Sequence, residues 1–128
     1  MQLRLKQLPS PHWVTKLTTL DESVWKMRSR VTTGYLWSVT QTDSEISVVS
    51  PFSQLPHQID AEGPWSVFEV AGPLDFSLVG VIHRLTEPLK TAGISVFVIS
   101  SYDTDYLLVA ADKADAAVGT WVSVGVDA

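Results

Sequence analysis

Two carboxylates lie in a short polar segment between two apolar stretches, at Asp103 and Asp105. The flanking stretches, residues 94–100 and 106–110, are rich in β-branched residues and predict two strands joined by a hairpin. A carboxylate at such a connection can face a solvated pocket while the strands fix its position. We therefore interpret Asp105 as a candidate ligand contact, with Asp103 and Thr104 beside it.

A second segment, residues 70–81, is predicted to leave a strand, turn and start a helix. The first turn of a helix carries N–H groups without an acceptor inside the helix, and the peptide dipoles place about half a positive charge there. The backbone amides of residues 77–80 are therefore expected to attract an anionic group. If these amides and Asp105 converge, the site has one end for a negative group and one for a positive group. A free amino acid carries both.

Other interpretations of the two aspartates stay open. An Asp between strands often hydrogen-bonds its own backbone in a turn, and Asp103 fits this role better than Asp105. An Asp-x-Asp pair can also suggest a divalent cation, but alternating strand geometry points the two side chains apart and hard cations take roughly six or more oxygens. General acid/base catalysis by the pair lacks a nearby His, Cys or Lys to complete a site.

Two residues at the predicted helix start have structural alternatives. The Ser77 hydroxyl can cap the helix, which is compatible with a ligand contact. Gly80 can simply permit a turn and close helix packing, but inside a helix it costs about 1 kcal/mol relative to alanine, which suggests a close approach to its backbone.

The second half of the chain has the clearer pattern of elements. We predict strands at 65–71, 94–100 and 106–110 and helices at 77–92 and 112–122. The order strand, helix, strand, strand, helix is that of a ferredoxin-like split βαβ unit. It lacks a convincing final strand, because only a few residues follow the last helix.

The first half carries weaker signals. Residues 3–17 predict strands interrupted by prolines, and residues 21–27 predict a short helix capped by Asp21. Alternation between 35 and 48 predicts a hairpin, and the Pro- and Gly-containing stretch 51–64 is interpreted as a connection between the two halves. With fewer helical residues, this half is compatible with a degenerate copy of the second.

Length and charge restrict the class of protein. The 128 residues suit one domain or two modules of about 60 residues. Only 9 Lys and Arg stand against 14 Asp and Glu, a net charge of −5, which disfavours nucleic acid and anionic membrane as partners.

The residue types also limit the chemistry. The absence of cysteine excludes disulfides, thiolate nucleophiles and Cys-based zinc sites, and it fits a reducing cytoplasm. No apolar run approaches the ~20 residues that span a bilayer. His12, His57 and His83 have no second ligand at metal spacing, so neither a metal nor another cofactor is expected.

Three motifs together point to a known family: GPLDFSLVGV at 72–81, EPLKTAGISVF at 87–97 and ISSYDTDYLLV at 99–109. With these motifs the chain resembles a small bacterial ACT-domain protein of the aspartokinase-like subgroup, which is similar to the cytosolic arginine sensors of animals. The resemblance extends over the whole chain and is most specific between residues 65 and 110.

The resemblance implies an α+β fold of two ferredoxin-like ACT modules with helices on one face of each sheet. Residues 1–60 would be a degenerate N-terminal module and residues 61–128 the C-terminal module. Such modules bind small effectors, usually amino acids, in the crevice between them, and they are not catalytic. The implied function is therefore a non-enzymatic amino acid sensor.

The resemblance also implies residue roles. An acidic residue at the position of Asp105 contacts the cationic part of the ligand, and the backbone at the helix start lines the same pocket. The candidate ligand-binding residues are thus Asp103, Thr104 and Asp105 in the hairpin and Phe76, Ser77, Leu78, Val79 and Gly80 at the helix start. Phe76-Ser77-Leu78 replaces the Pro-Gly-Leu turn of common ACT domains, which leaves the identity of the ligand open.

One alternative function belongs to another class. The chain can be a structural or interaction module that forms a homo-oligomer and keeps only a vestigial pocket. In either case we expect a homodimer, because the short C-terminal half leaves a sheet edge to cover and two-fold dimers are the commonest soluble assembly.

Overall fold

The computed structural model describes residues 2–72 and 79–128, which form two compact units. The central unit is Pro9–Trp65, and the terminal unit is Met1–Leu8 together with Ser66–Ala128. The division between them falls after Leu8 and after Trp65, so the first eight residues belong with the C-terminal half of the chain. Sequence order alone does not reveal that exchange.

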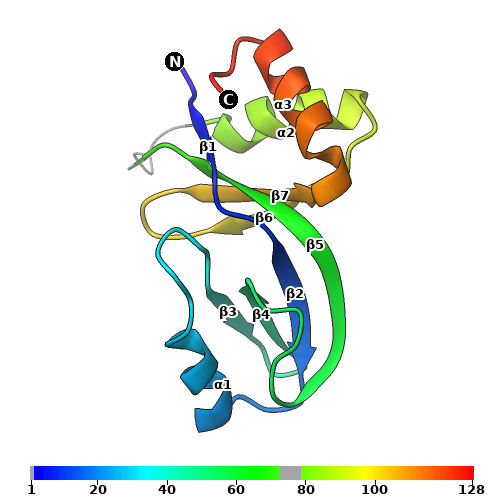
Figure 1. Ribbon diagram of the computed structural model, residues 1–128. Coiled ribbons are helices and arrows are strands. Elements are labelled where there is room, and N and C mark those ends of the chain that lie inside the picture. The colour runs from blue at the N-terminus through cyan, green and yellow to red at the C-terminus, as the bar shows by residue number, and fades with distance from the viewer. Residues whose placement is uncertain (1, 73–78) are drawn as a thin grey trace. The chain divides into compact units, whose positions relative to one another are not determined.

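The elements alternate between strands and a few short helices (Figure 1). The strands are β1 (Leu5–Gln7), β2 (His12–Leu17), β3 (Ser38–Gln41), β4 (Ile46–Ser50), β5 (Gln58–Val70), β6 (Phe97–Ser100) and β7 (Asp105–Ala110). The helices are α1 (Glu22–Arg28), α2 (Val81–Thr91) and α3 (Ala114–Ser123), the last preceded by a 3-10 turn, η1 (Ala111–Lys113).

The terminal unit has the strand order β1-β5-β7-β6, in which β5 contributes its C-terminal residues. The predicted strand, helix, strand, strand, helix succession is confirmed by β5, α2, β6, β7 and α3. The fourth strand of the ferredoxin-like pattern is β1, which comes from the other end of the chain and pairs antiparallel to β5, with Leu5 opposite Val70. Near the C-terminus, Asp127 forms only an isolated parallel bridge to Arg4.

The core of the terminal unit lies between its sheet and helices α2 and α3, which cover one face (Figure 1). Val81, Leu85 and Leu89 recur every four residues along α2, so they form one apolar stripe. From α3, the Trp121 ring meets Phe68 of β5 edge-on with centroids 4.9 Å apart. The indole Nε1 of Trp121 donates to the Leu85 carbonyl at 2.8 Å, which ties the two helices together and satisfies the buried N–H.

The start of α2 differs from the prediction. The helix begins at Val81, whereas the sequence predicted a start at Ser77. Gly80 precedes it with φ of 80°, in the left-handed region that glycine adopts without strain, and no atom of the described residues outside its chain neighbours lies within 4 Å of where its Cβ would be. The turn conformation therefore explains Gly80, and no other described segment of the chain approaches it.

The central unit repeats the strand order of the terminal unit. Its order is β5-β2-β4-β3, with the N-terminal residues of β5 taking part and α1 following β2. The predicted hairpin is confirmed by the antiparallel pairing of β3 with β4. Asp21 caps α1 as predicted, because its side chain accepts from the Ser23 N–H at 3.0 Å. The described residues between β4 and β5 form no helix, so the central unit has the ferredoxin-like strand order but lacks the second helix of that pattern.

The stretch 51–64 is not the connection that its glycine and prolines predicted, because β5 begins at Gln58. Gly63 and Pro64 form a bulge, since Val14 pairs with Glu62 and His12 with Trp65. A proline lacks the ladder N–H and is tolerated at such a bulge. Gly63 has φ of 153°, and a Cβ there would lie 2.5 Å from Cδ1 of Trp13. Gly63 and Pro64 therefore bend this strand without ending it.

His12 is a fully buried imidazole in the central unit. Its Nε2 accepts from the Leu36 N–H at 2.9 Å, and its ring centroid lies 5.3 Å from that of Tyr35. The neutral ring then carries its proton on Nδ1, which has no partner among the described residues. Burial lowers the pKa of His12 from 6.5 to about 4.

The lowered pKa of His12 predicts a pH-dependent stability. Between pH 6.5 and about 4 the unfolded chain binds a proton at His12 and the folded chain does not, so the free energy of unfolding falls as the pH falls through this window. His12→Gln keeps an acceptor for the Leu36 N–H and does not titrate. Chemical denaturation at several pH values should give a shallower pH slope for the variant, and identical slopes would contradict the assignment.

Candidate ligand site at the hairpin between β6 and β7

The hairpin that carries the predicted aspartates is present. β6 and β7 pair antiparallel from Phe97 opposite Leu108 to Ser100 opposite Asp105. The turn is closed by a hydrogen bond from the Ser101 N–H to the Thr104 carbonyl at 2.8 Å. The Ser101 hydroxyl donates to the same carbonyl at 3.1 Å, so the turn is fixed by both backbone and side chain.

Thr104 attaches this turn to the end of β5. Its side chain is buried, and its hydroxyl donates to the Val70 carbonyl at 2.5 Å. Val70 is the last residue of β5, and the chain leaves it toward α2. The hydrogen bond therefore attaches the turn of the β6–β7 hairpin to Val70, where segment 70–81 begins.

Asp105 is held by the neighbouring strand. Its Oδ1 accepts from the Ser100 hydroxyl at 2.5 Å across the β6–β7 pair, and the residue is half-buried. This cross-strand bond differs from the local turn role that the sequence left open. Because a carboxylate has about four lone-pair sites, the Ser100 bond leaves Asp105 with acceptor capacity for a ligand. Asp103, two residues before it, is exposed in the turn.

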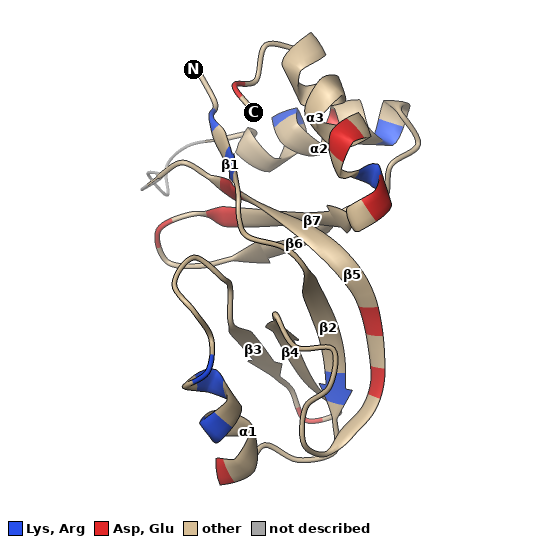
Figure 2. Cartoon of the chain, in the orientation of Figure 1, with Lys and Arg blue, Asp and Glu red and all other residues tan. Residues whose placement is uncertain are grey.

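Carboxylates lie near the Tyr106 hydroxyl at the hairpin. Burial raises the pKa of this hydroxyl, and the carboxylates of Glu69 and Asp103 raise it further, against an opposing hydrogen bond with Ser101. Figure 2 shows acidic residues at this end of β5 and β7. Nearby carboxylates favour a cationic group over an anionic one.

The start of α2 supplies the opposite polarity. The first hydrogen bond within the helix runs from the Arg84 N–H to the Gly80 carbonyl at 2.9 Å, so the N–H groups of residues 81–83 have no acceptor inside the helix. Val79 lies just before the helix. Its side chain is 91% exposed, so packing does not explain an apolar residue at this position. The remaining predicted residues of this segment, Phe76, Ser77 and Leu78, lie outside the described residues.

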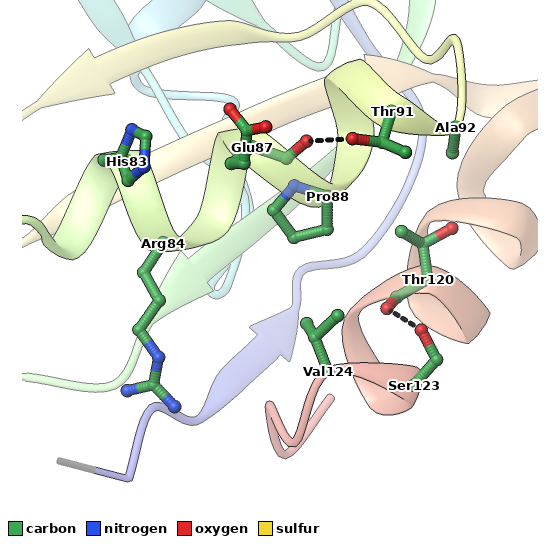
Figure 3. A pocket seen from close by; sticks show the side chains of 9 residues that line it. All are labelled: His83, Arg84, Glu87, Pro88, Thr91, Ala92, Thr120, Ser123 and Val124. Atoms are coloured by element: carbon green, nitrogen blue, oxygen red, sulfur yellow. Dashed lines mark hydrogen bonds between the residues drawn. The ribbon is translucent and has the colours of Figure 1, made fainter.

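A hollow of about 620 Å³ lies elsewhere in the terminal unit, between α2 and α3 (Figure 3). It combines the charged side chains Arg84 and Glu87 with the apolar surfaces of Pro88 and Val124. Its other lining residues are His83, Thr91, Ala92, Thr120 and Ser123. It contains none of the predicted site residues. The sequence analysis missed it because segments more than 25 residues apart form it only when the two helices pack together.

The central unit contains a Ser, His and Asp cluster that the sequence analysis also missed. The Asp21 carboxylate lies 2.7 Å from His57 Nε2 and accepts from the Ser23 hydroxyl at 2.5 Å, while Ser23 Oγ lies 3.4 Å from the same Nε2. A catalytic triad needs the acid and the nucleophile on different ring nitrogens. The cluster therefore serves the cap of α1.

Residues 2–72 and 79–128 contain no group of three or more His, Cys, Asp or Glu side chains arranged to hold a metal ion. None of the helices in this part of the chain combines the length and apolar composition needed to cross a membrane.

Comparison with known proteins connects the terminal unit to a family. Residues 60–120 match the ACT domain family. This segment includes α2, β6, β7 and the hairpin with Thr104 and Asp105. No curated protein matches the chain.

Solved structures share the fold over nearly the whole chain. A protein from Agrobacterium tumefaciens has a TM-score of 0.81 and 27% identity, covering 99% of this chain and 92% of that chain. The regulatory subunit of aspartate kinase from Thermus flavus has a TM-score of 0.63 and 10% identity over 97% of each chain. Aspartate kinase from Clostridium acetobutylicum has a TM-score of 0.69 and 8% identity, covering 94% of this chain and 34% of that chain. These comparisons support the coarser prediction, an α+β ferredoxin-like fold of the ACT type, and the chain is structurally similar to aspartate kinase regulatory domains.

The buried Thr104 hydroxyl gives a direct test of the hairpin attachment in the terminal unit. Thr104→Val keeps the shape but leaves the Val70 carbonyl without this donor, so the free energy of unfolding should fall by about 1–3 kcal/mol. Thr91→Val removes an exposed helix hydroxyl and should change it by less than about 0.5 kcal/mol. Urea denaturation measures both, and equal effects would contradict a special role for Thr104.

Proposed function

We propose that the protein is a non-enzymatic regulatory protein that binds a free amino acid at the β6–β7 hairpin and the segment leading into α2. The hydrogen bond from the Thr104 hydroxyl to the Val70 carbonyl carries the proposal, because it attaches the turn of the hairpin to the end of β5, from which the chain leads into α2. Asp105 then meets the cationic group of the ligand, and the backbone at the start of α2 meets its carboxylate.

The family match supports the regulatory role. The matched segment contains the hairpin and α2, and aspartate kinase regulatory subunits share the fold of the whole chain. Regulation by a bound amino acid is the function that this likeness suggests. The carboxylates near Tyr106, together with the amides at the start of α2 that have no acceptor inside the helix, support a ligand that carries both charges.

We further propose that the central unit is the second, degenerate ACT module. Both units have the same relative strand order, and the central unit has no helix between β4 and β5. The structural match to the regulatory subunit of aspartate kinase from Thermus flavus covers 97% of this chain and 97% of that subunit, so both units of this chain take part in the match. A fold-based relation of this kind does not require the sequence of the two units to remain similar.

The proposal includes a cytoplasmic homodimer. The lack of cysteine suits a reducing compartment, and β6 is the last strand in the order of the terminal unit, where a second copy can add its own strand. Light scattering of the purified protein measures the mass directly, and a monomer across the micromolar range would overturn the dimer.

A thermal-shift screen of the twenty amino acids tests ligand binding. A ligand at a hundredfold excess over its Kd stabilises the folded state by about 2.7 kcal/mol, so at least one amino acid should raise the melting temperature at millimolar concentration. Asp105→Asn keeps an acceptor for the Ser100 hydroxyl and removes the charge, so it should abolish the shift without loss of folding.

Two control variants sharpen this experiment. Asp43→Asn makes the same charge change in the other hairpin and should keep the shift. Ser123→Trp fills the hollow between α2 and α3 and should also keep it. A shift lost only with Ser123→Trp would move the site to that hollow. A dimer that responds to no amino acid would favour the interaction module with a vestigial pocket.

A further inference from the structure

One peptide group at the end of β5 holds both the hairpin and the N-terminal segment. Its carbonyl belongs to Val70 and accepts from the Thr104 hydroxyl at 2.5 Å. Its N–H belongs to Ala71 and donates to the Arg4 carbonyl at 2.8 Å. A peptide group is planar and rigid, so a rotation that changes one of these hydrogen bonds changes the other. The two bonds also polarise each other, because each strengthens the dipole of the same group.

The hydrogen bonding continues from the N-terminal segment to the C-terminus. The Asp127 N–H donates to the Leu3 carbonyl at 2.9 Å, and the Leu5 N–H donates to the Asp127 carbonyl at 2.7 Å. The side chains of Arg4 and Asp127 form an ion pair at 3.0 Å. Both ends of the chain are therefore joined to each other and, through Arg4, to the peptide group that binds Thr104.

Apolar contacts make this terminal pairing more than a surface contact. Leu3, Leu5 and Val126 are 2%, 6% and 3% exposed and belong to the core of the terminal unit. β1 itself has only three residues, however, and connects to the rest of the chain through Pro9 and Pro11. A short terminal strand of this kind opens at a lower free energy than the core beneath it.

We propose that the paired termini and the β6–β7 hairpin form one conformational device, in which docking of β1 and the state of the hairpin are energetically coupled through the Val70–Ala71 peptide group. Fixing the hairpin stabilises the docked termini. The part of the inference that concerns a ligand rests on the proposed function. An amino acid bound at the hairpin stabilises the docked termini and so weakens the binding of a partner that captures the undocked termini. By reciprocity, that partner weakens amino acid binding by the same factor.

A double-mutant cycle on the ligand-free protein tests the coupling. Thr104→Val loosens the hairpin, and Leu3→Ala loosens the termini. Each substitution raises the unfolding equilibrium constant by some factor. If the hairpin and the termini are coupled, the factor for the double variant is smaller than the product of the two single factors by about fivefold or more. Thr91→Val with Leu3→Ala is the matched control pair, and the factor for its double variant should equal the product of the single factors within about twofold. If the factors of both pairs multiply in this way, the coupling is overturned.

Amide hydrogen exchange in the single variants tests the same coupling if the double variant does not fold. In Thr104→Val alone, the amides of Leu5 and Asp127 should exchange about tenfold faster than in the natural sequence, and in Thr91→Val they should not change. Unchanged exchange at both amides in Thr104→Val would overturn the proposal.

The ligand arm uses the twenty amino acids as probes. Any of them that raises the melting temperature should also slow exchange at Leu5 and Asp127, and an effect on melting temperature without slower exchange would overturn the coupling alone. Intact coupling in the double-mutant cycle with no thermal shift from any amino acid would overturn the proposed function alone.

Discussion

The pairing of β1 with the end of β5 is the constraint on which the terminal unit depends. Without it, the ferredoxin-like sheet lacks its fourth strand, because near the C-terminus Asp127 contributes only one bridge. The N-terminal leucines supply that strand and bury their side chains beneath α2 and α3. The same pairing places the Arg4 carbonyl at Ala71, so the strand that completes the core also contacts the beginning of the candidate site.

Polarity in the site arises from ordinary features of the fold. The negative end comes from the Asp105 carboxylate, held by Ser100, and from Glu69 and Asp103 near Tyr106. The positive end comes from backbone amides that every helix leaves unpaired. A regulatory role needs no more than this, since binding a zwitterion requires two opposite poles at a fixed separation and no reactive group.

Glycine and proline show where local sequence signals are ambiguous. Gly63 and Pro64 predict a connection, yet they form a bulge within β5, because Trp13 on the partner strand needs the space that a Cβ would fill. Gly80 predicts close contact, yet it serves the left-handed turn before α2. In both cases the residue type showed that the backbone is unusual, but not why. The reason for Gly63 is a neighbour distant in sequence, and the reason for Gly80 is a helix boundary that periodicity places only within a few residues.

The sequence by itself determined the local elements and the chemical types at the site. Local patterns were sufficient for the presence of α2, though not for its first residue, and for the β6–β7 hairpin and the Asp21 cap of α1, because each depends on neighbours within a few residues. Tertiary structure alone decided that residues 1–8 join the C-terminal half, and that Thr104 attaches to Val70. It also decided that α2 and α3 enclose a hollow. These features need contacts between residues far apart in the chain, and no local pattern encodes such contacts.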